Sequence, residues 1–161
     1  MNITLHRTLM VCVLAGALAL AVALLVLPKA ASAAPPEPVN LTETLGPEYC
    51  GFPVLSEVSG KMNVIDLPNG DSLWKYPGLR ITLTNKETGK QETYVSTGGF
   101  RATKLKGGET LLVSTGQNVI YSPSIGILVL KGRVTFVEDR DGNFSQPKGD
   151  GSIVNVCDQL A

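Results

Sequence analysis

The sequence has a single histidine, His6, close to the N-terminus. The rest of the chain therefore has no imidazole to act as a general base beside a serine or cysteine nucleophile, and none to bind zinc. A Walker-type phosphate loop is also missing, since neither Gly60-Lys61 nor Gly89-Lys90 has the upstream glycine or the following serine or threonine. These absences exclude histidine-dependent catalysis and P-loop nucleotide binding, and no cofactor is expected.

Long apolar runs are absent except for one near the N-terminus. Residues 1–7 are mostly polar and end in Arg7, Leu9–Leu27 is almost wholly apolar, and Ala31-Ser-Ala33 supplies small residues before Ala34. This order predicts a signal peptide over residues 1–33, cleaved before Ala34 to give a secreted protein. The alternative is an uncleaved signal that anchors the chain to the plasma membrane, because the apolar run is almost long enough to cross a bilayer.

An excess of charge is missing too, with 14 basic and 14 acidic residues in the whole chain. Cleavage would remove two of the basic residues, Arg7 and Lys29, and leave 12 against 14, a net charge of −2. Non-specific nucleic-acid binding needs a clear cationic excess. No nucleic-acid partner is therefore expected.

Cysteines are few: Cys12 lies in the signal segment, which leaves Cys50 and Cys157. An even pair in an exported protein predicts a disulfide, with two free thiols as the alternative. The bridge would close nearly the whole domain into one loop and bring its first and last elements together. This favours a closed barrel over an open β-sandwich.

Helical periodicity is absent after Gly51, and short runs of period two alternate with glycine-bearing turns. The pattern predicts an all-β fold, an antiparallel meander of about 8–10 short strands that forms a small up-and-down barrel, with a β-sandwich as the alternative, after an N-terminal signal helix. The predicted organisation is a signal peptide over 1–33, a Pro-rich leader over 34–48 and a single β domain over 49–161. The strands are expected at 52–58, 62–67, 79–84, 91–97, 100–105, 110–115, 125–130 (buried on both faces), 133–138, 143–145 and 153–156.

In a meander, alternate turns lie at the same end of the sheet, so turn charges are expected to separate by sign. The expected basic rim consists of Lys61, Lys86, Lys90, Lys104, Lys106, Lys131, Arg133 and Lys148. The expected acidic end consists of Asp66, Asp71, Glu138, Asp139, Asp141 and Asp158. A basic rim would suit an anionic envelope polymer or lipid headgroups; ordinary solvated turns are the alternative.

The tetrapeptide Val95-Ser-Thr-Gly98 recurs as Val113-Ser-Thr-Gly116. The two copies end strands that are two apart in the predicted meander, so they are expected at the same end of the sheet. One interpretation places Thr97, Thr115, Gln117 and Asn118 on the rim of a ligand-binding mouth. The other is a repeated strand-exit turn without a function.

Two other motifs have a functional and a structural interpretation. Asp139, Asp141 and Asn143 place oxygen atoms at alternate positions, as in a calcium loop, but Asp141-Gly142 is also a strong hairpin signal. No metal site is predicted beyond this weak calcium candidate. Trp74-Lys-Tyr76 is either a sugar-stacking platform or a strand end that packs into the core.

Several short motifs together resemble a known group of proteins. These are Cys50-Gly-Phe-Pro-Val54, Pro77-Gly-Leu79, Leu83-Thr-Asn85, Thr88-Gly-Lys90, Gly132-Arg-Val-Thr135, Asp141-Gly-Asn143 and Val156-Cys157. Over residues 50–161 the sequence resembles small exported proteins of unassigned function from actinomycetes. The resemblance implies an actinobacterial source, export and a β-rich fold, and it implies no catalytic or binding residue.

Three functional classes follow from these features. The first is an exported, non-catalytic β module that binds a small ligand or the cell envelope. The second is a small barrel enzyme, an isomerase, cyclase or carboxylate-based glycosidase, although no catalytic residue is nominated. The third is a membrane-tethered structural domain.

Overall fold

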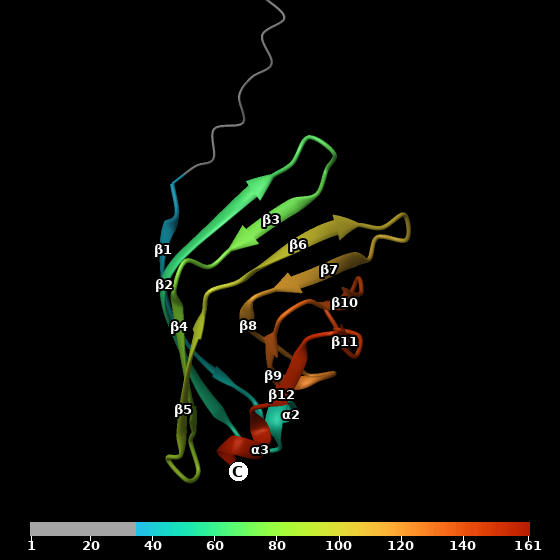
Figure 1. Cartoon of the computed structure of the whole chain (residues 1–161). Coiled ribbons are helices and arrows are strands. Elements are labelled where there is room, and N and C mark those ends of the chain that lie inside the picture. Colours follow the sequence, from blue (N-terminus) through green and yellow to red (C-terminus); the bar gives the residue numbers. More distant parts are fainter. Residues whose placement is uncertain (1–34) are drawn as a thin grey trace, which may run out of the picture. The chain divides into compact units, whose positions relative to one another are not determined.

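The computed structural model describes residues 35–161, so the predicted signal peptide and its cleavage site lie outside the described residues. Over the described range the protein is all-β and antiparallel, with strands β1 to β12 and two one-turn helices (Figure 1). The predicted fold class is confirmed. The strands do not close into a barrel: nine of them form one bent sheet, and the other three form a second sheet.

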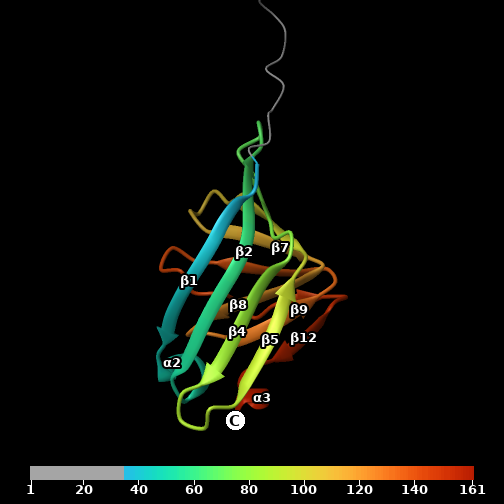
Figure 2. The same ribbon diagram turned by 90° about the vertical axis from the view of Figure 1, so that its left-hand side faces the viewer.

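Strand β2 (Val54–Asp66) runs through both halves of the bent sheet. Its first part pairs with β1 (Glu37–Leu45) and β4 (Leu79–Asn85), and its second part pairs with β3 (Ser72–Lys75). Strand β5 (Gln91–Ser96) completes the first half, which we call sheet A and which Figure 2 shows face on.

The second half, sheet B, runs from the end of β2 through β3 and four further strands. They are β6 (Gly99–Lys104), β7 (Thr110–Thr115), β10 (Val134–Glu138) and the short β11 (Lys148–Gly149). Sheet C is separate and consists of β8 (Gln117–Ser122), β9 (Gly126–Lys131) and β12 (Ser152–Asn155).

Three neighbouring segments of chain bend at the same level: β2, β3 with β4, and β5 with β6. We call the point where each segment bends a crossing. Both β3 and β4 run antiparallel to β2, so the chain continues from β3 into β4 without reversing, and by the same pairing β5 continues into β6. Glycines lie at each crossing: Gly60 within β2, Gly78 between β3 and β4, and Gly98 between β5 and β6. Gly60 and Gly78 have φ of 137° and 83°, a region in which other residues are strained.

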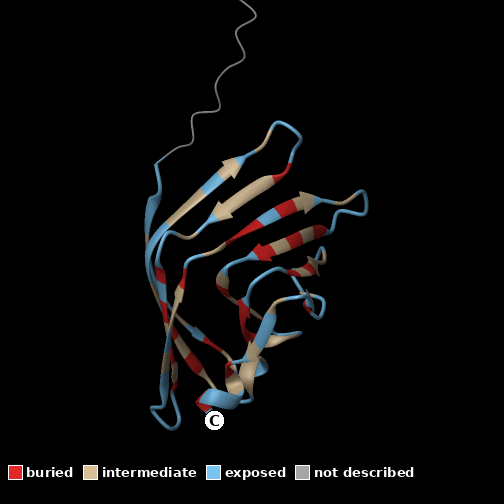
Figure 3. Cartoon of the chain, viewed as in Figure 1, coloured by how far each residue is buried: buried red, intermediate tan, exposed pale blue. Residues whose placement is uncertain are grey.

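Strand β9 is buried on both faces, as predicted for residues 125–130. Ile127 and Val129 pack into a core shared with sheet A, whereas Leu128 and Leu130 pack into a second core shared with sheet B. All four residues are at most 7% exposed, and Figure 3 draws buried positions of this kind in red. Because side chains alternate along a strand, one apolar run supplies both cores.

The predicted disulfide joins Cys50 to Cys157, with the two Cα atoms 5.1 Å apart. Each cysteine belongs to a one-turn helix, α2 (Pro47–Cys50) after β1 and α3 (Cys157–Leu160) after β12. Strands β1 and β12 lie in different sheets, β1 paired with β2 and β12 paired with β9. The barrel prediction was wrong because a disulfide needs neighbouring Cα atoms, not neighbouring strands in one sheet.

The predicted leader over 34–48 is also corrected, because β1 occupies Glu37–Leu45 and pairs along nine residues of β2. The prolines suggested a free extended segment, but proline is tolerated on an edge strand. Val39, Glu43 and Leu45 alternate inward on β1, and Leu45 is 4% exposed.

Shortening Leu130 should destabilise the protein because it would open a cavity in the core shared with sheet B. We expect Leu130→Ala to lower the free energy of unfolding by about 2–5 kcal/mol in urea titrations. Ile153→Ala is the matched control, since Ile153 lies directly opposite on β12 and is 41% exposed. Its cost should be about 1 kcal/mol or less, and equal losses for the two variants would contradict the burial assigned to β9.

Removing the disulfide should also destabilise the fold, because the bridge closes a loop with a sequence separation of 107 residues. The double variant Cys50→Ser and Cys157→Ser is expected to lose about 2–5 kcal/mol of unfolding free energy. Thiol reduction of the wild type provides the control and should reproduce that loss. An unchanged unfolding midpoint in both cases would show that the bridge does not limit the unfolded chain.

Candidate ligand-binding site

The outer face of sheet B carries a mixture of apolar and cationic side chains that belong to neither core. On β6, Phe100 and Ala102 point into the core, so Gly99 and Arg101 point outward. The strand register continues this outer face through Leu73 of β3 and its neighbours on β7 and β10.

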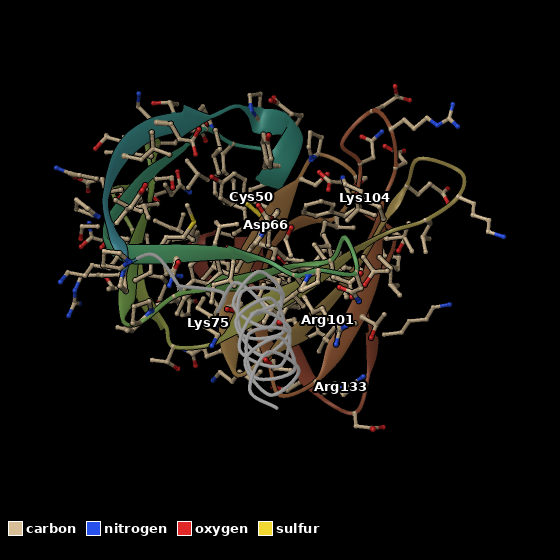
Figure 4. All side chains as sticks on the ribbon, turned by 90° about the horizontal axis from the view of Figure 1, so that it is seen from above. Cys50, Asp66, Lys75, Arg101, Lys104 and Arg133 are labelled. Atoms are coloured by element: carbon tan, nitrogen blue, oxygen red, sulfur yellow. A yellow bond between two sulfur atoms is a disulfide. The ribbon has the colours of Figure 1, made fainter. Side chains whose placement is uncertain are left out.

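Two cross-strand rows lie side by side on this face. The first contains Lys75, Gly99 and Thr115, which pair directly across β3, β6 and β7, with Arg133 just before β10. The second contains Leu73, Arg101, Val113 and Thr135. Figure 4 shows Lys75, Arg101 and Arg133 on the same side of the ribbon, away from Cys50.

These rows line an open cavity of about 720 Å³. Leu73, Pro77 and Val113 contribute apolar groups to its wall. Trp74, Tyr76 and Phe100 also line it, although their side chains pack on the core shared with sheet B. Three cationic residues, Lys75, Arg101 and Arg133, also line it, and its lining contains no carboxylate. Cavities of about 300–1,000 Å³ with apolar walls and a few polar groups are typical of small-molecule sites.

Glycine backbone at the bend and at the end of β7 forms part of the cavity lining, at Gly98, Gly99 and Gly116. Tyr76 N–H donates to Gly98 O (3.1 Å), Gly98 N–H donates to Gln117 O (3.2 Å), and Gly132 N–H donates to Gly116 O (3.0 Å). A Cβ on Gly116 would lie 2.8 Å from Gly98 Cα, so these backbones approach too closely for a side chain. Glycine at these positions therefore lets the connections pack closely together.

Arg101 is the one lining cation with an ion pair to a described residue. Its Nε and Nη2 atoms donate to one carboxylate oxygen of Asp71, at 2.8 and 2.6 Å. These hydrogen bonds hold the pKa of the Asp71 carboxyl below its ordinary value of 3.8. Asp71 lies in the turn between β2 and β3, so the guanidinium leans away from the first row and is already partly neutralised.

A smaller cavity of about 180 Å³ lies against the inner side of the same strands. Trp74, Tyr76 and Phe100 line both cavities, and both other rings pack edge-on against Phe100, with centroids 6.4 and 5.9 Å away. Burial raises the pKa of Tyr76 to about 12. The Tyr76 phenol is therefore neutral at physiological pH, which makes it a wall of the site and not a base.

The predicted ligand-rim residues divide into two pairs. Thr97 and Thr115 are exposed and line the large cavity. Gln117 Nε2 donates to Val95 O (3.0 Å), and the buried Asn118 donates to Ser114 Oγ (2.8 Å) and Thr115 O (3.0 Å). The second pair thus joins the two Val-Ser-Thr-Gly copies, which do lie beside each other.

The predicted basic rim does not form one end of the protein. The prediction of that rim required the chain to reverse its direction at residues 97–99, whereas β5 continues into β6 there in the same direction. Lys86 and Lys90 of the β4–β5 turn are therefore at the opposite end of this bent hairpin from Lys104 and Lys106 of the β6–β7 turn.

The predicted acidic end is mixed in sign for the same reason. Ser72, next to Asp71, pairs with Ala102, close to Lys104, and Arg140 donates to Gly107 O beside Lys106. Of the remaining predicted rim, Lys61 lies within β2, Lys131 ends β9, Lys148 begins β11, and Arg133 alone lines the cavity.

The weak calcium candidate is a capped turn. The Asp139 carboxylate accepts backbone hydrogen bonds from Asp141 and Asn143, at 2.9 and 2.8 Å, and these lower its pKa. Within residues 35–161 no three His, Cys, Asp or Glu side chains are grouped so that they could hold a metal ion.

Lys75, Arg101, Leu73 and Val113 were not nominated as a group from the sequence. The signal that could have found them is the alternation on each strand: Leu73 and Lys75 flank the inward Trp74, and Arg101 lies between the inward Phe100 and Ala102. Joining these strands requires the β3–β6 pairing, which is not visible in one sequence.

The chain matches no protein-family model, and no curated protein or solved structure matches it. The resemblance to small exported actinomycete proteins therefore stays a prediction. The disulfide is compatible with an extracellular protein. No helix within residues 35–161 has the length and apolar character needed to span a membrane.

Replacing Asp71 should destabilise the protein at neutral pH, because it leaves Arg101 without its partner. The folded-state pKa of Asp71 is depressed, so its contribution is present above the ordinary value of 3.8 and is lost as the pH falls through the lower folded-state value. Urea midpoints of the wild type and Asp71→Asn should therefore differ at neutral pH and converge on acidification. Asp158→Asn is the control, because Asp158 is an exposed carboxylate on α3. A difference between the wild type and Asp71→Asn that persists in acid would contradict the role of the ion pair.

Proposed function

We propose that this protein is a secreted, non-catalytic binding module that takes a small ligand in the cavity on the outer face of sheet B. The observation that carries the proposal is the 720 Å³ volume bounded by apolar walls and three cationic residues.

The construction of the cavity supports binding of a ligand to a preformed site. Its floor is backbone at Gly98 and Gly99, which the strand pairing and the crossings hold in place. A preformed pocket avoids the entropic cost of ordering loops when a ligand enters. Thr97 and Thr115 add exposed hydroxyl groups that can orient the ligand.

Secretion is the part of the proposal that depends on the sequence. The apolar run Leu9–Leu27 and the small residues before Ala34 predict a cleaved signal, and the disulfide is compatible with an oxidising compartment. A retained signal would make the same binding domain a membrane-tethered protein. N-terminal sequencing of protein from the culture medium distinguishes these alternatives.

The enzyme alternative has less support. A glycosidase acid needs a carboxyl whose pKa is raised beside a cleft. The shifted carboxyl groups found in residues 35–161, Asp71 and Asp139, are both shifted downward by hydrogen bonds. Binding to an envelope polymer through a basic rim also loses support, because the lysines of that rim lie at different ends.

Filling the cavity should weaken binding of a neutral apolar probe. We expect N-phenyl-1-naphthylamine to fluoresce with the wild type and to bind at least about tenfold more weakly to Val113→Trp, since an indole would occupy the cavity. Val137→Trp is the control, because Val137 is on the outer face of β10 but does not line the cavity.

Thermal unfolding should show that both tryptophan variants are folded. No probe binding to the wild type, or equal weakening by both substitutions, would contradict the proposed site. Native mass spectrometry of protein from its own culture medium gives an independent test, since a ligand retained by the wild type should be absent from Val113→Trp.

A further inference from the structure

The cavity has an uncompensated positive charge. Its lining includes Lys75, Arg101 and Arg133 but no aspartate or glutamate, although the whole chain has equal numbers of acidic and basic residues. Arg101 is paired with Asp71, as described above. The side chains of Lys75 and Arg133 form no hydrogen bond or ion pair with any residue from 35 to 161, and both residues are exposed.

These two unpaired cations face each other across a floor almost without side chains. Both lie in the row Asn63, Lys75, Gly99, Thr115, Arg133, in which three strand spacings separate Lys75 from Arg133, about 14 Å between Cα atoms. Gly99 has no side chain and Thr115 a short one, which leaves room for a group between the cations. Both side chains are long and flexible enough to reach toward it.

The next row supplies a different surface. Leu73 and Val113 lie there, half-buried, and the Arg101 guanidinium between them is drawn toward Asp71. Pro77 extends the apolar wall at the bend. A ligand that spans both rows therefore meets cations over one part of its length and apolar groups over the other.

We propose that the ligand of this cavity is an amphiphile with an acidic headgroup, a phosphate, sulfonate or carboxylate, which Lys75 and Arg133 bind above Gly99. This inference rests on the proposed function and adds the chemical class of the ligand. A neutral apolar ligand would leave both cations unused, and a small polar anion would leave the apolar wall in contact with water. An acidic amphiphile satisfies both parts by charge complementarity and apolar burial.

Two fluorescent probes with the same aromatic body test the charge. They are N-phenyl-1-naphthylamine, which is neutral, and 1-anilinonaphthalene-8-sulfonate, which adds one sulfonate. The folded wild type should bind the sulfonate about tenfold more tightly, as two partly exposed charge contacts allow. The preference should fall when the ionic strength rises from about 0.01 M to about 1 M, because the Debye length shortens from about 30 Å to about 3 Å.

The double variant Lys75→Gln and Arg133→Gln should lose the preference for the sulfonate and bind the neutral probe as the wild type does. The matched control is Lys104→Gln with Lys106→Gln, which removes the same charge at the β6–β7 turn, outside the cavity lining. This control should keep the preference. Equal losses in the two double variants would show a general charge effect and overturn the inference.

The remaining outcomes separate the inference from the proposed function. If both probes bind the wild type equally, the site exists but is not selective for acids, so the inference is wrong and the proposed function stands. If neither probe binds, both are wrong. Dodecyl phosphate should displace the sulfonate probe, whereas inorganic phosphate should not; displacement by inorganic phosphate would show a simple anion site and contradict the amphiphile.

Discussion

The bend of the nine-stranded sheet depends on close backbone contact at three crossings, where Gly60, Gly78 and Gly98 lie at one level of neighbouring strands. A hypothetical Cβ on Gly60 would lie 3.0 Å from Leu79 Cα, so the backbones leave almost no room there. The bend turns sheet B away from sheet A and lets both pack on sheet C. The candidate site exists because the outer side of the same bend is hollow.

Local features of the sequence were enough to predict most of the strands and the disulfide. They missed β1, β3 and β8, and the strand predicted at 143–145 is only an isolated bridge between Glu138 and Phe144. Alternation of apolar and polar residues located β4, β5 and β7 almost to the residue, and the dense run at 125–130 indicated a strand with two buried faces. These predictions succeeded because burial on one or two faces acts directly on neighbouring residues of one strand. The cysteine pair was predictable because only two cysteines remain after the signal segment.

The sequence did not reveal at which glycines the chain reverses its direction and at which it continues. Glycines at Gly60, Gly78 and Gly98 look like turns, but each lies within a chain pass that keeps its direction. A glycine permits a tight turn or a kink equally well, and only pairing with distant strands decides between them. The predicted charge separation depended on counting those turns, so one misread crossing at 97–99 displaced several lysines.

The site was only partly visible for the same reason. The repeated Val-Ser-Thr-Gly motif pointed to the correct crossing and to Thr97 and Thr115, because β5 continues into β6 and β6 pairs with β7. Lys75 and Arg133 are 58 positions apart and meet only through the β3–β6–β7–β10 pairing. Their joint positive charge is a property of the folded sheet, and the neutral overall composition conceals it.

Strand β9 has a mechanical consequence for the whole domain. Its alternate side chains belong to two different cores. If one core unfolded alone, β9 would have one face packed and the other face in a disordered environment. Sheets A and B should therefore melt together in one cooperative transition. Through β9, sheet B behind the cavity is therefore coupled to the core shared with sheet A, next to which the disulfide joins α2 to α3.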